Sequence, residues 1–114
     1  MYVEQLPPHD ERAEESVIGS LLIDSEAINT VSTLLSPEDF YAERPRWCYE
    51  ACLSLWQNNE AINAVTVGHR LALLEKLDDV GGPSYLGHLV NSVPTSAHVE
   101  HYARIVSRTH TLRR

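Results

Sequence analysis

The sequence predicts an all-α fold, a compact bundle of about six helices that ends in one long helix. Apolar side chains recur three and four residues apart through most of the 114 residues, which is the helical period. No segment of useful length alternates apolar and polar residues as a strand does. Hydrophobic residues make up 43% and charged residues 22% of the chain, a composition typical of a folded globular domain.

Two helices are expected in the first third of the chain. The first has apolar residues at positions 13, 17, 18, 21 and 22, and the acids Glu11, Glu14 and Glu15 stand in its first turn, where they favour the helix dipole. The second has apolar residues at 27, 28, 31, 34 and 35. It ends where Ser36 can cap a short new turn that has Pro37 at its first position.

A third and a fourth helix follow. The third runs from Trp47 to Trp56, starts after Pro45 and ends near residues 58–59; its wide apolar face predicts a central place in the core. The fourth has apolar residues at 67, 71, 74 and 77, with Thr66 as its expected N-cap. Residues 80–83, Val-Gly-Gly-Pro, then interrupt the helical pattern.

The last two helices flank Pro94. A short fifth helix is expected from Tyr85 to Val93. It must end before Pro94, because the residue before a proline disfavours the helical conformation. The sixth spans residues 96–114, begins with Thr95 or Ser96 as its cap and contains no glycine or proline. At 1.5 Å per residue it would be about 28 Å long. We expect the chain to be the front part of a longer protein, with this helix continuing into an interface or a linker.

The net charge of −7 is unevenly distributed. Residues 1–60 hold twelve acidic side chains against three arginines, whereas residues 61–114 hold four acids against six basic residues. An acidic body repels phosphate, so the chain is not expected to grip DNA itself. The acidic half is interpreted as a solvated surface; the alternative is a docking face for a basic partner.

No catalytic residue and no cofactor-binding residue is predicted. A phosphate-binding loop needs G-x-x-x-x-G-K-[ST], and the sole lysine, Lys76, follows Glu75 rather than a glycine. The segment 82–86, Gly-Pro-Ser-Tyr-Leu, lacks the final glycine of a nucleophile elbow. The adjacent acids Glu14-Glu15 and Asp78-Asp79 are interpreted as solvated surface, since acid–base chemistry needs convergent groups.

No metal site is predicted either. Cys48 and Cys52 lie four residues apart on one helix and could place two thiolates on a metal. Both fall on the apolar stripe, however, and are interpreted as small core residues without a disulfide. His98 and His101 are interpreted as exposed polar positions.

Seven residues are candidates for contact with a partner. The long last helix carries an apolar face wider than a short bundle edge buries, and Tyr85 is of a type enriched at interfaces. The candidates are Tyr85, Val99, Tyr102, Ile105, Val106, Thr109 and Leu112. Packing on the chain's own bundle is the alternative for the first half of the helix and for Tyr85; beyond Ile105 an intermolecular role is preferred.

A series of motifs, in order along the chain, resembles the N-terminal domain of the bacterial replicative DNA helicase of the DnaB type. Pro7-Pro8 and then residues 13–22, AEESVIGSLL, are similar to the family's P-P-x-x-x-x-A-E-x-S-V-L-G opening. The others are residues 39–41 (DFY) followed by 48–52 (CYEAC), 65–67 (VTV), 81–86 (GGPSYL) and 102–106 (YARIV). The chain departs from the family at residues 61–63, AIN in place of P-I-D, and at the two cysteines.

The resemblance implies a non-catalytic domain for assembly and primase docking. Residues 1–95 would form the N-terminal bundle and residues 96–114 the start of a helical hairpin. Such domains pair within a hexameric ring whose motor domain, absent from this chain, uses ATP and Mg and unwinds DNA 5′ to 3′. Primase is the implied partner, binding of a helicase loader is left open, and DNA is reached only through the ring.

The competing hypothesis is a free-standing acidic helical adaptor that binds a basic protein. Under either hypothesis the protein is expected in the cytoplasm, because no apolar run approaches the roughly 18 residues of a membrane span and no signal peptide is recognisable.

Overall fold

The computed structural model describes residues 9–114, which form helices and connecting turns without a strand. Pro7-Pro8 of the opening motif lies outside the described residues. The α-helices are α1 (Glu11–Ile23), α2 (Ile28–Leu34), α3 (Glu43–Gln57), α4 (Ala64–Leu73), α5 (Leu77–Val80), α6 (Pro83–Asn91) and α7 (Val99–Arg113). Two short 3-10 helices, η1 (Ser25–Ala27) and η2 (Pro37–Asp39), flank α2. The all-α prediction is confirmed.

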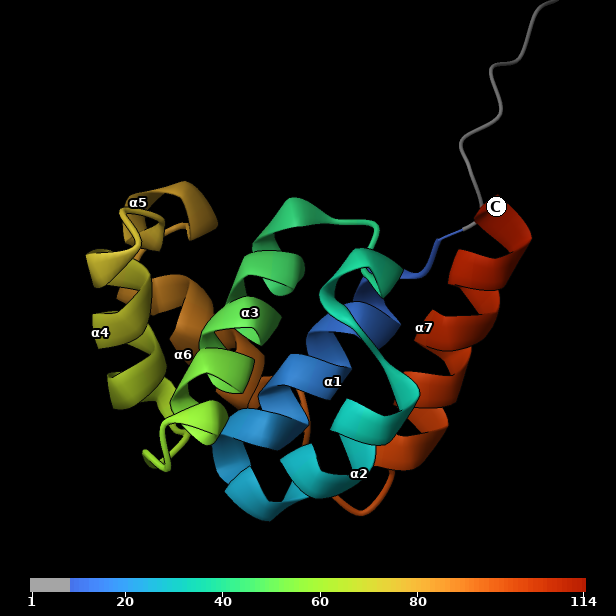
Figure 1. Ribbon diagram of the computed structural model, residues 1–114, viewed down its shortest axis with the longest axis horizontal. Helices are drawn as coiled ribbons and strands as arrows, with labels where there is room; N and C mark the ends of the chain where they lie inside the picture. The colour runs from blue at the N-terminus through green and yellow to red at the C-terminus, as the bar shows by residue number, and fades with distance from the viewer. Residues whose placement is uncertain (1–8) are drawn as a thin grey trace, which may run out of the picture.

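Helix α1 is the centre of the bundle (Figure 1). It packs against α3, α6 and α7, and the pairs α3–α4 and α4–α6 extend the bundle away from it. Val17, Ile18 and Leu21 of α1 have no exposed surface. Helices α4, α5 and α6 therefore gather at one end of the molecule and α7 at the other (Figure 1).

Helix α3 supplies the core residues that its wide apolar face predicts. Cys48, Tyr49, Ala51 and Cys52 have no exposed surface, and the Tyr49 hydroxyl donates a hydrogen bond of 2.8 Å to the Leu35 carbonyl. Burial raises the pKa of the Cys48 thiol to about 12 and raises that of Cys52 as well. Because both side chains lie in the hydrophobic core without exposed surface, their interpretation as small core residues is confirmed.

The second helix and its stop signal are as predicted, although other helix boundaries differ. Ser36 and Asp39 form a capping box around η2, with Pro37 at its first position. Helix α3 begins at Glu43, before Pro45, because proline fits the first turn of a helix. Asn63, and not Thr66, caps α4; Thr66 returns a hydrogen bond to the Asn63 N–H.

Two corrections concern the second half. Leu77 does not end the fourth helix: Glu75 adopts a left-handed conformation with φ of 59°, and Leu77 starts the extra helix α5. The last helix begins at Val99 instead of residue 96, since residues 94–98 form a turn in which Ser96 binds Asp24 instead of capping α7. Its 15 residues correspond to about 22 Å.

Candidate interaction surface

Helix α7 lies along α1 and α2 with one face in the hydrophobic core (Figure 1). Val99, Ala103 and Val106 are buried in that contact. Tyr102 and Ile105 lie at its edge and border a hollow of about 300 Å³ beside the start of α1. The helix and the N-terminal bundle thus share one core, and the start of a hairpin at residues 96–114 stays a prediction.

The structure divides the predicted interface residues into two groups. Three are at most 8% exposed: Tyr85, Val99 and Val106. Four keep accessible surface, of which the last is 63% exposed: Tyr102, Ile105, Thr109 and Leu112. Val106, just beyond Ile105, is buried within the chain because α7 packs on α1, α2 and η2. Contact of the four accessible residues with a partner stays a prediction.

Tyr85 joins three helices inside the chain. Its hydroxyl donates a hydrogen bond of 2.8 Å to Glu15 Oε2 on α1, and the Arg44 guanidinium lies 4.0 Å from its ring centroid. Arg44 also donates to the Val80 carbonyl at 3.0 Å. Burial, and then the Glu15 carboxylate, raise the pKa of Tyr85. In this structure its role is internal, fastening α6 to α1 and α3.

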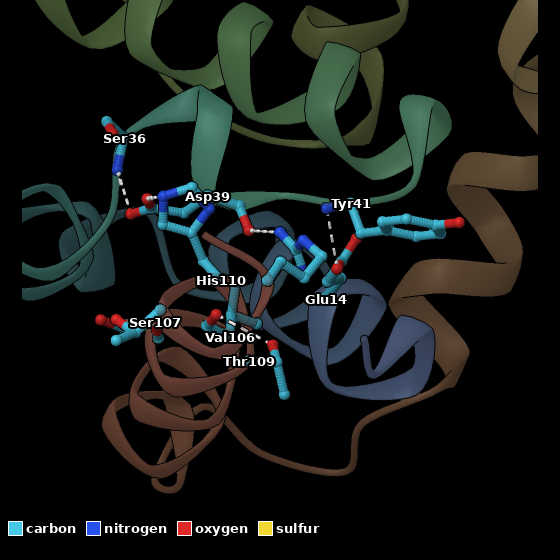
Figure 2. Close-up of polar contacts among 10 residues, drawn as sticks. Glu14, Ser36, Asp39, Tyr41, Val106, Ser107, Thr109 and His110 are labelled. Atoms are coloured by element: carbon cyan, nitrogen blue, oxygen red, sulfur yellow. Dashed lines mark hydrogen bonds and ion pairs between the residues drawn. The ribbon is translucent and has the colours of Figure 1, made fainter. Parts of the chain in front are cut away.

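Glu14 is a buried carboxylate that the sequence interpretation placed on the surface. It has no exposed surface, and one of its oxygens accepts a hydrogen bond of 2.9 Å from the Tyr41 N–H (Figure 2). The other oxygen accepts a hydrogen bond of 3.0 Å from the Ala42 N–H. The interpretation as solvated surface is therefore wrong for Glu14. The sequence signal was its spacing: with Ile18 and Leu21 it occupies positions i, i+4 and i+7 of the apolar stripe.

Asp39 ties the end of α7 to η2. Its Oδ2 accepts the Ser36 N–H at 2.9 Å, and its Oδ1 lies 3.3 Å from His110 Nε2 (Figure 2). Arg113 donates to the Asp39 carbonyl at 2.8 Å and places its guanidinium 5.2 Å from the Tyr41 ring centroid. The last turn of α7 is thus held by polar contacts in addition to the apolar core.

The pH dependence of stability should reveal the state of Glu14. Burial raises its pKa above the ordinary 4.5, against the lowering effects of the Ala42 and Tyr41 N–H groups and of Arg113. Because the folded-state pKa is raised, the contribution to stability is full below the unfolded-state pKa and is lost as pH rises through the folded value. Relative to Glu14→Gln, the unmodified protein should therefore lose unfolding free energy as pH rises from about 4 to about 7 in denaturant titrations. A relative gain with rising pH would show that the N–H groups outweigh burial.

The other polar candidates do not assemble into a reactive site within residues 9–114. His98, His101, Asp78 and Asp79 are exposed, as expected, and no group of three or more His, Cys, Asp or Glu is placed to hold a metal ion in that range. In the same range no helix has the length and apolar character to cross a membrane. What the geometry offers is surface for binding: the accessible residues of α7 at one end and a groove between α4 and α6 at the other.

The curated proteins that are similar in sequence to this chain include bacterial replicative DNA helicases. The chain is 40% identical over 114 residues to the replicative DNA helicase DnaB of Geobacillus stearothermophilus, and 40% identical over 111 residues to the replicative DNA helicase DnaC of Bacillus subtilis. These matches cover 100% and 97% of the chain but 25% and 24% of the relatives. The chain thus spans about a quarter of the length of the curated relatives it matches.

Solved structures agree in fold. The N-terminal domain of DnaB helicase from Mycobacterium tuberculosis superposes with a TM-score of 0.93 at 40% identity, covering 95% of this chain and 75% of that one. A DnaB-like replicative helicase, solved with its interactions with primase, matches with a TM-score of 0.79 at 28% identity, covering 89% of this chain and 24% of that one. The family sequence model described as DnaB-like helicase N terminal domain matches residues 6–108 of the chain. By sequence and by fold, then, the chain belongs to the family of DnaB-like helicase N-terminal domains.

Proposed function

We propose that this chain is the non-catalytic assembly and primase-docking domain of a hexameric replicative DNA helicase. The observation that carries the proposal is the family match over residues 6–108, together with a structural neighbour that was solved with its interactions with primase. The acidic surface supports docking of proteins over direct binding of DNA, because phosphate requires clustered cations. The family match favours this function over a free-standing adaptor.

In this proposal, the ATP hydrolysis and DNA unwinding are carried out by another domain of the full-length helicase. ATP and Mg bind in a motor domain beyond the present chain, where hydrolysis drives 5′ to 3′ unwinding of duplex DNA at the replication fork. The present domain pairs with its copies within the hexamer and recruits primase, with a helicase loader as a further candidate partner. It works in the cytoplasm.

Self-association and primase binding test the proposal together. We expect a form extended past Arg114 by one helical hairpin to sediment as dimers or larger species, to bind the primase of the same organism in calorimetry, and to lack ATPase activity. Leu112 is 63% exposed near the end of α7, so burial at a subunit contact would stabilise it by about 1.5–3 kcal/mol. Leu112→Asp should therefore weaken the dimer by about tenfold or more.

The matched control is Thr111→Asp, which places the same charge on the adjacent exposed residue. It should leave the dimer intact if the contact is made through Leu112. Monomers at high concentration together with no heat of primase binding would overturn the proposed function. Equal weakening by both aspartates would show that charge, and not the apolar contact, governs pairing.

A further inference from the structure

An apolar groove of about 340 Å³ lies between α4 and α6. These two helices belong to the end of the molecule opposite α7 (Figure 1). Ala64, Gly68 and Ala72 of α4 line it at every fourth residue, so they form one row along the helix. Leu77 and Leu86 close it from α5 and α6. With no bulky side chain in that row, another helix could approach α4 closely.

Helix α4 leaves apolar side chains exposed. Val65, which lines the groove, is 66% exposed. The bundle buries only Val67 and Leu71 of α4. Leu73, which is 78% exposed, borders a separate hollow together with Leu55 and Glu60. Exposed apolar surface beside a groove is typical of a binding site.

One end of the groove is acidic. A second hollow, also about 340 Å³, shares Ala72 and Leu77 with the groove and is further lined by Glu75 and Asp78. Within residues 9–114 neither acid forms an ion pair. The neighbouring Lys76 forms no ion pair with either acid in that range, and its ammonium lies 4.6 Å from the Trp47 ring centroid. The groove therefore offers apolar contact along its length and two acidic side chains without an ion-pair partner at one end.

We propose that this groove binds an amphipathic helix of a partner protein that carries Lys or Arg beyond its apolar anchors. The row from Ala64 to Ala72 extends about 12 Å at 1.5 Å per residue. That length matches anchors at positions i, i+4 and i+7 of a helix laid in a groove. The cation would meet Glu75 and Asp78, so apolar contact supplies affinity and charge sets the orientation. This site lies far from the accessible residues of α7 and does not depend on the proposed pairing or on primase docking.

Two designed peptides of about 18 residues provide the probe. Both place leucines at i, i+4 and i+7 of one helix face; one carries arginine pairs at its two ends, and the other carries glutamate pairs. We expect the arginine peptide to bind about tenfold tighter or more, with changes in amide chemical shift confined to α4, α5 and α6. Equal affinities for the two peptides, no binding, or shifts centred on α7 would overturn the proposal.

A charge swap on the protein completes the test. Glu75→Lys/Asp78→Lys should reverse the preference so that the glutamate peptide binds tighter. The control is Glu26→Lys/Glu38→Lys, which makes the same change in net charge at exposed residues on η1 and η2; it should keep the preference for arginine. Circular dichroism melts check that both variants are folded. If the control reverses the preference as well, the effect is one of overall charge and the assigned site is wrong.

Discussion

Replacing Glu14 with alanine should destabilise the protein by about 3 kcal/mol at neutral pH. The substitution removes the acceptors of the Tyr41 and Ala42 N–H groups. A buried donor without a partner costs about 1–3 kcal/mol, and two donors are affected at once. Urea titration followed by circular dichroism would measure the loss in unfolding free energy.

Glu14→Gln is the matched control for that loss. It keeps the size of the side chain and one acceptor oxygen, so its loss should be about half that of the alanine variant. A change of less than about 0.5 kcal/mol in Glu14→Ala would show that water satisfies both N–H groups, and that the carboxylate does not hold the loop at Tyr41 in place.

Gly19→Ala should cost about 2 kcal/mol even though alanine is the better helix former. Gly19 lies inside α1, and a Cβ atom there would overlap the Leu89 carbonyl oxygen and lie 3.1 Å from Ser92 Oγ. The carbonyl cannot easily move, because it accepts hydrogen bonds from the Ser92 N–H and hydroxyl. Relief would require α1 and α6 to separate within a packed core, which is costly.

Gly87→Ala separates this clash from helix propensity. Gly87 lies inside α6, and a Cβ atom there would meet nothing within 4 Å. This variant should gain about 1 kcal/mol, the usual advantage of alanine over glycine in a helix. Thermal or urea unfolding of both variants gives the comparison. If Gly19→Ala is as stable as Gly87→Ala, the close approach of α1 and α6 is not a structural requirement.

The sequence was sufficient for the helical type and for every α-helix of residues 9–114 except the short α5, because helical periodicity is a local signal. The apolar stripe of residues 13–22 predicts α1, and Pro94 predicts the end of α6. Family membership also followed from motifs in the sequence, and the family match confirms it. Helix starts were less predictable: Asn63 and Thr66 are both good caps, and only the backbone geometry decides between them.

The candidate binding surface was predictable only in part. Periodicity showed that α7 carries a broad apolar face, but it could not show that α1 and α2 cover Val99 and Val106 while Leu112 stays exposed. The groove between α4 and α6 was not predicted at all. Leu74 belongs to the apolar stripe predicted for the fourth helix, and only the tertiary packing leaves it 48% exposed.

By itself, then, the sequence determined the helical class, the core stripes, the absence of a phosphate-binding loop and the family of this chain. Only the tertiary structure decided the environment of Glu14. Its hydrogen-bond donors, the N–H groups of Tyr41 and Ala42, belong to a loop 27 and 28 residues away in the sequence. The tertiary structure likewise places the Tyr85 hydroxyl where it donates a hydrogen bond to Glu15, which is 70 residues away in the sequence. The physical reason is range: periodicity and capping act within a few turns of one helix, whereas burial and charge pairing depend on segments that only folding brings together.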